Sequence, residues 1–211
     1  MGTPLWQFWT DWAIKALGIL ATLLAVYVAL FGPQLRHWIV PPRLSIALAS
    51  GEGWPAVLHV LNNATNQATQ TMGIWYHVRV ENETRWSPVT DVHIFLLMME
   101  APDTAGDFQV IWEGSCAVSW RHEPSPEPKS IGRRAEGDLC HVLKEPRMMR
   151  LSPLVTGQVP EVFTGPLRLR LTLQARGIES DSNTLRVTVS WNGQWSDDRE
   201  EMRRHFVVAP A

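Results

Sequence analysis

The residues LRLRLTLQAR, at positions 167–176, decide the fold class of this chain. Apolar residues fill every second position, which is the pattern of a strand with one buried face. The inward positions are Leu167, Leu169, Leu171, Leu173 and Ala175, and the outward ones are Arg168, Arg170, Thr172, Gln174 and Arg176. A second alternating run, residues 185–191, follows a loop of hairpin length. Together the two runs predict an antiparallel hairpin.

Shorter runs of the same kind precede and follow this hairpin. We expect further strands at residues 44–48, 56–61, 74–81, 89–99, 108–112, 116–120 and 206–208, with shorter candidates at 139–143 and 148–151. The polar residues 62–70 and the proline-rich residues 122–137 are predicted to be loops. Asp197 and Glu200 resemble a capping box, which indicates one short helix before the last strand. Eight to ten strands with little helix indicate an antiparallel β-sandwich over residues 42–211.

A different pattern, AIKALGILATLLAVYVALF, occupies residues 13–31 and is apolar throughout except for Lys15. At helical rise it spans roughly 28 Å, about the thickness of the hydrocarbon core of a bilayer. Gly32 and Pro33 are expected to end the helix. Asp11 nearly cancels Lys15, and no small-x-small cleavage site follows. We therefore interpret the segment as an uncleaved transmembrane anchor rather than a signal peptide.

Aromatic and basic residues flank the anchor, as they do at membrane interfaces. The predicted interface anchors are Trp6, Trp9, Trp12, Lys15, Arg36 and Trp38. Arg36 and Arg43 outweigh Lys15 by about one charge, so the positive-inside rule places the C-terminal part in the cytoplasm. Residues 1–41 are thus expected to form an interfacial segment, a single membrane pass and a short linker. The expected partners are the lipid bilayer and another membrane or membrane-proximal protein.

The net charge argues against nucleic acid as a partner. The whole chain carries a formal charge of −2, with 19 basic and 21 acidic residues. Residues 42–211 keep all of these except Lys15, Arg36 and Asp11, so the predicted domain is slightly acidic. A nucleic-acid surface needs an excess of basic groups to neutralise phosphates.

Two clusters have residue types that could support chemistry. His59, His77 and His93 fall on three successive predicted strands, but no H-x-H or C-x-x-C spacing accompanies them, so ordinary strand histidines are the preferred interpretation. A thiol nucleophile with a base could be drawn from Cys116, His122, Glu123 and His141. Buried cysteines and loop histidines are the preferred interpretation there too. We expect no catalytic residue, metal or cofactor, and no enzymatic activity.

The outward side chains of the hairpin form a candidate interaction surface. Arg168, Arg170, Arg176 and Arg186 line one face, where a solvated sheet is the default and a docking site for a carboxylate-bearing partner or lipid headgroups is the alternative. Trp191 continues the inward register, whereas Trp195 is either a core residue or an exposed contact.

The stretch WYHVRVEN, residues 75–82, and the tail WNGQWSDDREEM, residues 191–202, carry a resemblance. Both are similar to uncharacterised bacterial single-pass membrane proteins with an immunoglobulin-like, CARDB-like β-sandwich. The resemblance covers residues 43–209 and implies a fold without an activity. Cys116, Trp120 and Cys140 come in the order Cys…Trp…Cys, but the sequence departs from true immunoglobulin domains because 24 residues are too few for the usual inter-sheet disulfide to span the intervening strands. That bridge is therefore not assumed.

Three hypotheses follow from these features. The leading one is a membrane-anchored, non-enzymatic interaction module whose domain lies close to the bilayer. The second is an extracytoplasmic binding domain for envelope or carbohydrate ligands, which a disulfide between Cys116 and Cys140 would favour. The third is a thiol-dependent enzyme, which requires an accessible thiol of depressed pKa.

Overall fold

The computed structural model describes residues 5–62, 67–84, 86–123, 127–152 and 159–211 of the chain. Within these ranges, the side chains of residues 5–8, 10–11, 33–38, 59–62 and 67–68 lie outside the description. The chain forms two compact units, Met1–Pro41 and Pro42–Ala211. The first unit contains one long helix, and the second contains the β-strands and a short helix.

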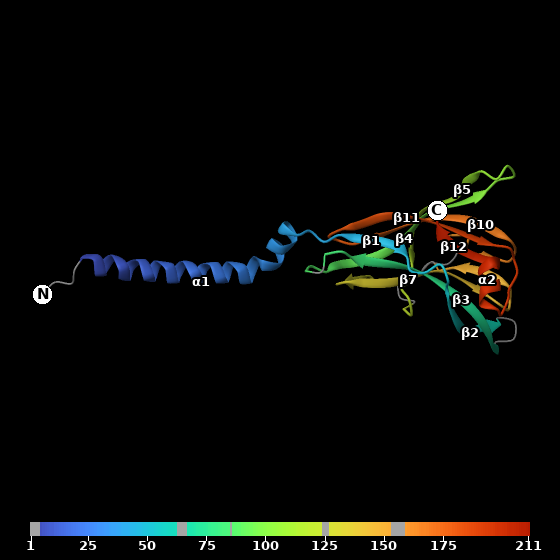
Figure 1. Ribbon diagram of the computed structural model, residues 1–211, viewed down its shortest axis with the longest axis horizontal. Coiled ribbons are helices and arrows are strands. Elements are labelled where there is room, and N and C mark those ends of the chain that lie inside the picture. The colour runs from blue at the N-terminus through green and yellow to red at the C-terminus, as the bar shows by residue number, and fades with distance from the viewer. Residues whose placement is uncertain (1–4, 63–66, 85, 124–126, 153–158) are drawn as a thin grey trace. The chain divides into compact units, whose positions relative to one another are not determined.

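The helix of the first unit, α1 (Leu5–Ile39), is longer than the predicted membrane pass. Its segment Trp12–Gly32 is long and apolar enough to cross a membrane. The prediction that Gly32 and Pro33 end the helix is wrong, because helical structure continues for six residues beyond Pro33. A proline removes one backbone hydrogen bond and bends a helix without always ending it. The ribbon of α1 accordingly changes direction toward its C-terminal end (Figure 1).

The second unit contains two six-stranded antiparallel sheets, which confirms the predicted β-sandwich. The first sheet contains β1 (Leu44–Leu48), β2 (Trp54–Asn62), β3 (Gln67–Asn82), β7 (Arg134–Leu143), β8 (Met148–Leu151) and β9 (Val162–Phe163). Strands β1 and β2 pair with successive halves of β3, and β7 pairs with its other edge. The long strand β3 therefore pairs with three other strands and lies at the centre of their pairing.

The second sheet contains β4 (Val89–Pro102), β5 (Phe108–Val118), β6 (Lys129–Ile131), β10 (Leu167–Arg176), β11 (Asp181–Trp191) and β12 (Phe206–Pro210). The predicted hairpin forms its centre, with Leu171 opposite Val187 and Leu167 opposite Trp191. Strand β4 pairs with β10 on one edge and with β5 and β6 on the other. Figure 1 shows these strands as a separate layer from the first sheet.

The core lies between the two sheets and is made of their inward side chains. Tyr76, Val78 and Val80 of β3 pack in the same cluster as the inward leucines of β10 and the valines of β11. Thr172 was expected to face outward into solvent but is buried, since the longer side chains of Met98 and Arg186 stand on either side of it in the sheet. Burying the apolar faces of both sheets is the main contribution to the stability of this unit.

Three element predictions are wrong in the same way, because pairing with a neighbouring strand of the sheet extends strands into predicted loops. Residues 108–112 and 116–120 were expected as two strands, but β5 runs through Gly114 and follows β4 by means of bulges. The predicted loop at residues 122–137 includes β6 and the start of β7. The predicted loop at residues 62–70 includes the first four residues of β3. Register with a neighbouring strand stabilises these polar segments.

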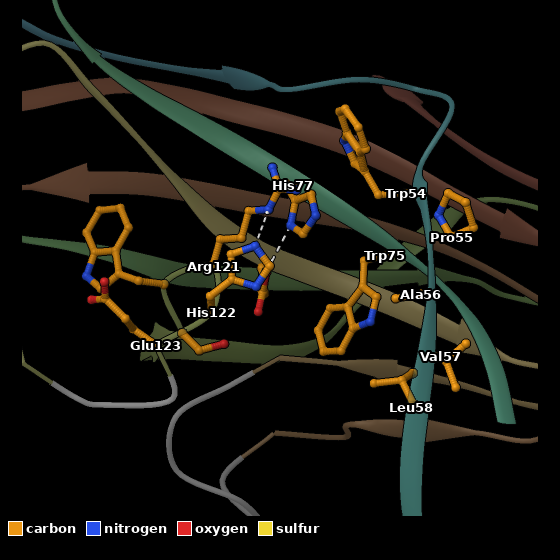
Figure 2. A pocket seen from close by; sticks show the side chains of 13 residues that line it. Trp54, Pro55, Ala56, Val57, Leu58, Trp75, His77, Arg121, His122 and Glu123 are labelled. Atoms are coloured by element: carbon orange, nitrogen blue, oxygen red, sulfur yellow. Dashed lines mark hydrogen bonds and ion pairs between the residues drawn. The ribbon is translucent and has the colours of Figure 1, made fainter. Parts of the chain in front are cut away.

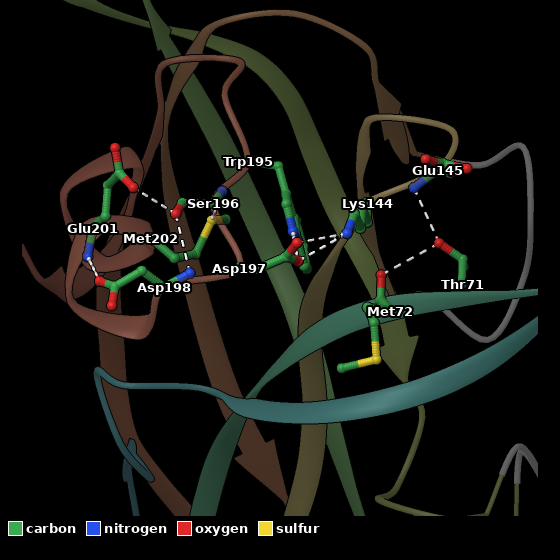
Figure 3. A network of polar contacts seen from close by, with 10 residues as sticks. All are labelled: Thr71, Met72, Lys144, Glu145, Trp195, Ser196, Asp197, Asp198, Glu201 and Met202. Carbon is green, nitrogen blue, oxygen red and sulfur yellow. Dashed lines mark hydrogen bonds and ion pairs between the residues drawn. The ribbon is translucent and has the colours of Figure 1, made fainter.

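The short helix α2 (Arg199–His205) begins one residue later than the predicted capping box implies. The N-terminal cap is Asp198, whose Oδ1 accepts a hydrogen bond from the backbone N–H of Glu201 at 2.8 Å. Asp197 is engaged elsewhere, because its Oδ2 lies 2.7 Å from Nζ of Lys144 in the β7–β8 turn (Figure 3). This ion pair joins a turn of the first sheet to the loop that follows β11 in the second.

Candidate functional site

The outer face of the first sheet carries a row of large side chains in register. Trp54 of β2 is opposite Trp75 of β3, Trp75 is opposite His141 of β7, and His141 is opposite Arg150 of β8. Residues opposite each other in antiparallel strands project from the same face. The rings of Trp75 and His141 are 4.2 Å apart between centroids, so His141 covers one side of the Trp75 indole.

A histidine–carboxylate pair forms the next row on the same face. His77 of β3 is opposite Asp138 of β7. A β-bulge gives β7 one extra residue between this pair and the preceding pair, Tyr76 and Cys140. Nδ1 of His77 lies 2.9 Å from Oδ1 of Asp138, although the two atoms are not aligned for a regular hydrogen bond. His77 is only 4% exposed, even though it projects from the outer face of the sheet. Something must therefore cover this part of the face.

The chain that leaves β5 lies beside this row, along the edge of β7. The carbonyl of Ser119 accepts a hydrogen bond from the N–H of Asp138 at 2.8 Å, and the N–H of Arg121 donates to the carbonyl of Glu136 at 2.9 Å. Trp120 completes this pairing with a bridge to Gly137. Residues 119–121 thus cross from the second sheet to the edge of β7, beyond the end of its pairing with β8.

Arg121 closes the site between this segment and β2. Its guanidinium lies over the Trp54 ring, 5.1 Å from the centroid, and forms an ion pair with Glu136. Its Nε also donates to Nε2 of His122 at 3.1 Å. A guanidinium on an aromatic face gains a favourable cation–π interaction. Arg121 is consequently held in place by an aromatic ring, a carboxylate and an imidazole together.

These elements enclose a pocket of about 540 Å³ on the outer face of the first sheet. Figure 2 shows its two sides: Trp54, Pro55, Val57 and Trp75 on one, and His77, Arg121, His122 and Glu123 on the other. The volume lies in the range of small-molecule sites, about 300–1,000 Å³. Trp54 remains 52% exposed at its mouth. The pocket therefore has an aromatic, apolar wall and a polar wall.

Each charged side chain of the polar wall already has a partner on the protein. Asp138 faces His77, Arg121 pairs with Glu136, and Glu123 Oε2 lies 2.9 Å from Lys129 Nζ. Beside the pocket, burial lowers the pKa of His141 from an ordinary 6.5 to about 4, with a smaller contribution from the charge of Arg150. His141 is therefore neutral at neutral pH and supports Trp75 as an uncharged ring.

The predicted arginine face lies on the other sheet. Arg168 and Arg170 both stack on Phe108, with Cζ 5.3 and 4.0 Å from its centroid, and NH1 of Arg170 lies 3.7 Å from Oε1 of Glu100. Arg176 lies over Phe95, at 5.7 Å from its centroid. Arg186 is exposed. The structure places these four side chains on the same side of β10 and β11, and their role as a docking surface stays a prediction.

The other predicted contact residues are dispersed. Trp195 is partly buried against the core and its indole N–H donates to Oδ1 of Asp197 at 3.0 Å. Trp9, Trp12 and Lys15 are all exposed on α1. The side chains of the other interface anchors, Trp6, Arg36 and Trp38, lie outside the described residues.

The two candidate chemical clusters do not assemble. His77 and His93 lie in different sheets, the side chain of His59 is outside the described residues, and no group of three or more metal-ligating side chains forms within the described chain. Cys116 of β5 is 1% exposed, and His122 and Glu123 line the pocket. Burial raises the pKa of the Cys140 thiol, and no disulfide joins it to Cys116. Both thiols therefore belong to the core.

The pocket was missed by sequence reasoning, although part of its signal is visible. Trp75 and His77 occupy the outward positions of a strand whose inward positions are apolar. A large aromatic residue on a face expected to be polar suggests that the face is covered or binds a ligand. Nothing in the sequence relates Trp54 and Arg121 to these positions, because the crossing of residues 119–121 to β7 is a tertiary feature.

Comparison with known proteins adds no family to this description. No protein-family model, no curated protein and no solved structure matches the chain.

Proposed function

We propose that this protein is a single-pass, membrane-anchored binding module without enzymatic activity, and that the pocket beside Trp54 and Trp75 is its binding site. The observation that carries the proposal is the pocket itself. Its volume of about 540 Å³ and its two walls of different polarity suit a small ligand or one residue of a larger one.

Binding fits the pocket better than catalysis does. The His77–Asp138 pair places a carboxylate beside an imidazole, and Ser119 also lines the pocket. The Ser119 hydroxyl, however, donates to the carbonyl of Ser152 at 3.4 Å rather than to the imidazole. A serine nucleophile needs its base within hydrogen-bond reach. The buried thiols do not suit the thiol-dependent alternative either.

The membrane part of the proposal rests on the apolar segment Trp12–Gly32 of α1. The full chain should stay in the membrane pellet after alkaline carbonate extraction, and a chain lacking residues 1–38 should appear in the soluble fraction. Release of the full chain by carbonate would contradict a membrane pass. The charge count favours a cytoplasmic domain, and an extracytoplasmic domain is the alternative.

The binding site is tested with the full chain in phospholipid nanodiscs. The probes are phenol, indole, cyclohexanol and neutral disaccharides, observed by ligand-detected NMR. At least one probe should bind, and Trp54→Ala should weaken its binding by about tenfold, equivalent to about 1.4 kcal/mol. The matched control is Trp86→Ala, because Trp86 is 79% exposed and does not line the pocket. Failure of every probe, or equal binding by both variants, would contradict the proposal.

A further inference from the structure

We infer that the ligand of this pocket is an uncharged sugar ring, a neutral hexose or N-acetylhexosamine unit. The inference rests on the proposed function and deepens it by naming the class of ligand. It follows from the pairing of charges in the polar wall and from the placement of the two tryptophans.

The charge pairing argues against an ionic ligand. Arg121 with Glu136 and Lys129 with Glu123 are ion pairs, and the Asp138 carboxylate lies beside the His77 imidazole, so each charged side chain of the wall already has a polar partner. An anion or cation would have to compete with one of these pairs and would leave the displaced partner uncompensated. When the displaced charge is partly buried, the free energy lost by leaving it unpaired exceeds the free energy gained from the new contact.

The polar wall also argues against a purely apolar ligand. The His77 ring is 4% exposed, its Nδ1 faces Asp138, and Nε2 at the other end of the ring is the polar atom left for the pocket. The pocket is further lined by His122 and Glu123, which carry polar atoms of their own. A hydrocarbon ligand would strip water from these groups without replacing its hydrogen bonds. A ligand with hydroxyl groups can replace them.

The tryptophan wall favours a ring with one apolar face. Trp75 has His141 against one side of its ring and itself lines the pocket. Trp54 has Arg121 over its ring and remains half exposed. Both indoles are therefore held in place by protein groups before a ligand arrives, which lowers the entropy cost of binding. A pyranose ring presents C–H groups on one face and hydroxyl groups at its rim. The C–H face matches the aromatic wall of the pocket, and the hydroxyl groups match the polar wall.

The test uses the full chain in nanodiscs whose lipids carry no sugar, because a glycoside detergent would compete. The neutral probes are maltose, cellobiose and N,N′-diacetylchitobiose, and the charged comparators are glucosamine and glucose 6-phosphate. At least one neutral disaccharide should bind with millimolar affinity or better, and both comparators should bind about tenfold more weakly. Trp54→Ala and His77→Gln should each weaken binding about tenfold, and Trp86→Ala should leave it unchanged.

Two further sets of measurements control for unfolded variants and for the source of the sugar. Near-ultraviolet circular dichroism checks that each variant is folded, and Trp54→Phe, which keeps an aromatic ring, should retain part of the affinity. Maltose is offered free and as the headgroup of a lipid in the nanodisc, which distinguishes a soluble source from a membrane-borne one. If phenol or indole binds at Trp54 and no neutral disaccharide does, the sugar class is wrong and the binding site stands. If a charged comparator binds as tightly as the disaccharides, the sugar class is also wrong.

Discussion

His77 of β3 and Asp138 of β7 face each other beside a β-bulge, with Nδ1 2.9 Å from Oδ1 and both residues buried. Both residues line the pocket, and the carboxylate lies against the His77 ring. Asp138→Asn removes the negative charge with little change of shape, so we expect the free energy of unfolding to fall by about 1–3 kcal/mol. Urea unfolding of the full chain in nanodiscs, followed by tryptophan fluorescence, measures the change. An unchanged midpoint would show that the pair does not contribute to stability.

The low pKa of His141 makes the domain sensitive to acid. Burial lowers this pKa to about 4 in the folded state, whereas the unfolded chain titrates near 6.5. The unfolded state therefore binds more protons between these two values, and stability falls as the pH drops from about 6.5 to 4. The loss from this one group is up to about 3 kcal/mol.

His141→Phe provides the matched control for this titration. Phenylalanine keeps a ring against Trp75 but cannot be protonated, so the variant should lose less stability than the native chain over the same pH range. Other titrating groups are common to both proteins and cancel in the comparison. Identical slopes of stability against pH would contradict the lowered pKa.

Gly53 precedes Trp54 and is needed for the approach of β2 to β3. Its φ is +67°, and a Cβ at this position would lie 2.5 Å from Cγ2 of Ile74 and 2.8 Å from Cζ of Tyr76. Gly53→Ala should therefore lower the free energy of unfolding by about 1–3 kcal/mol. Gly132→Ala is the control, since a Cβ there would meet no atom within 4 Å. Equal effects of the two substitutions would contradict the close packing at Gly53.

The side of the membrane can be tested with one engineered thiol. Cys116 and Cys140 are 1% and 0% exposed, so the native chain should resist a membrane-impermeant thiol reagent even in broken cells. Ile178, in the turn between β10 and β11, is 71% exposed, and Ile178→Cys supplies a reactive group. A cytoplasmic domain predicts labelling only after permeabilisation. Labelling of intact cells would place the domain outside.

The sequence predicts well what local periodicity determines. Residues 167–176 and 74–80 follow the two-residue period of a strand, and most of their predicted inward side chains are buried. Periodicity predicts a strand less well where pairing with a strand far away in the sequence determines the structure. An example is β6, whose three residues lie in a proline-rich stretch and pair with β4. Pro33 likewise shows that a helix-breaking residue can lie inside a helix. Local rules specify the cost of such positions but not whether the element forms in spite of it.

The candidate site was also predicted only where local periodicity determines the structure. Trp75 and His77 were identified as outward residues of one strand, but the pocket that they line also needs residues 119–121, which cross from the other sheet. The bulge in β7 that aligns Asp138 with His77 has no marker in the sequence. The immunoglobulin-like resemblance stays a prediction, as does the arginine surface.

The central claim, that the pocket beside Trp54 and Trp75 binds ligand, is tested most directly by indole NMR. The full chain is labelled with ¹⁵N at its eleven tryptophan indoles, and each signal is assigned by Trp→Phe substitution. Titration with the best-binding neutral disaccharide should shift the indole signals of Trp54 and Trp75 and leave those of Trp86 and Trp195 in place. Shifts confined to Trp86 or Trp195, or no shift at Trp54 and Trp75 when the ligand is bound, would contradict the account.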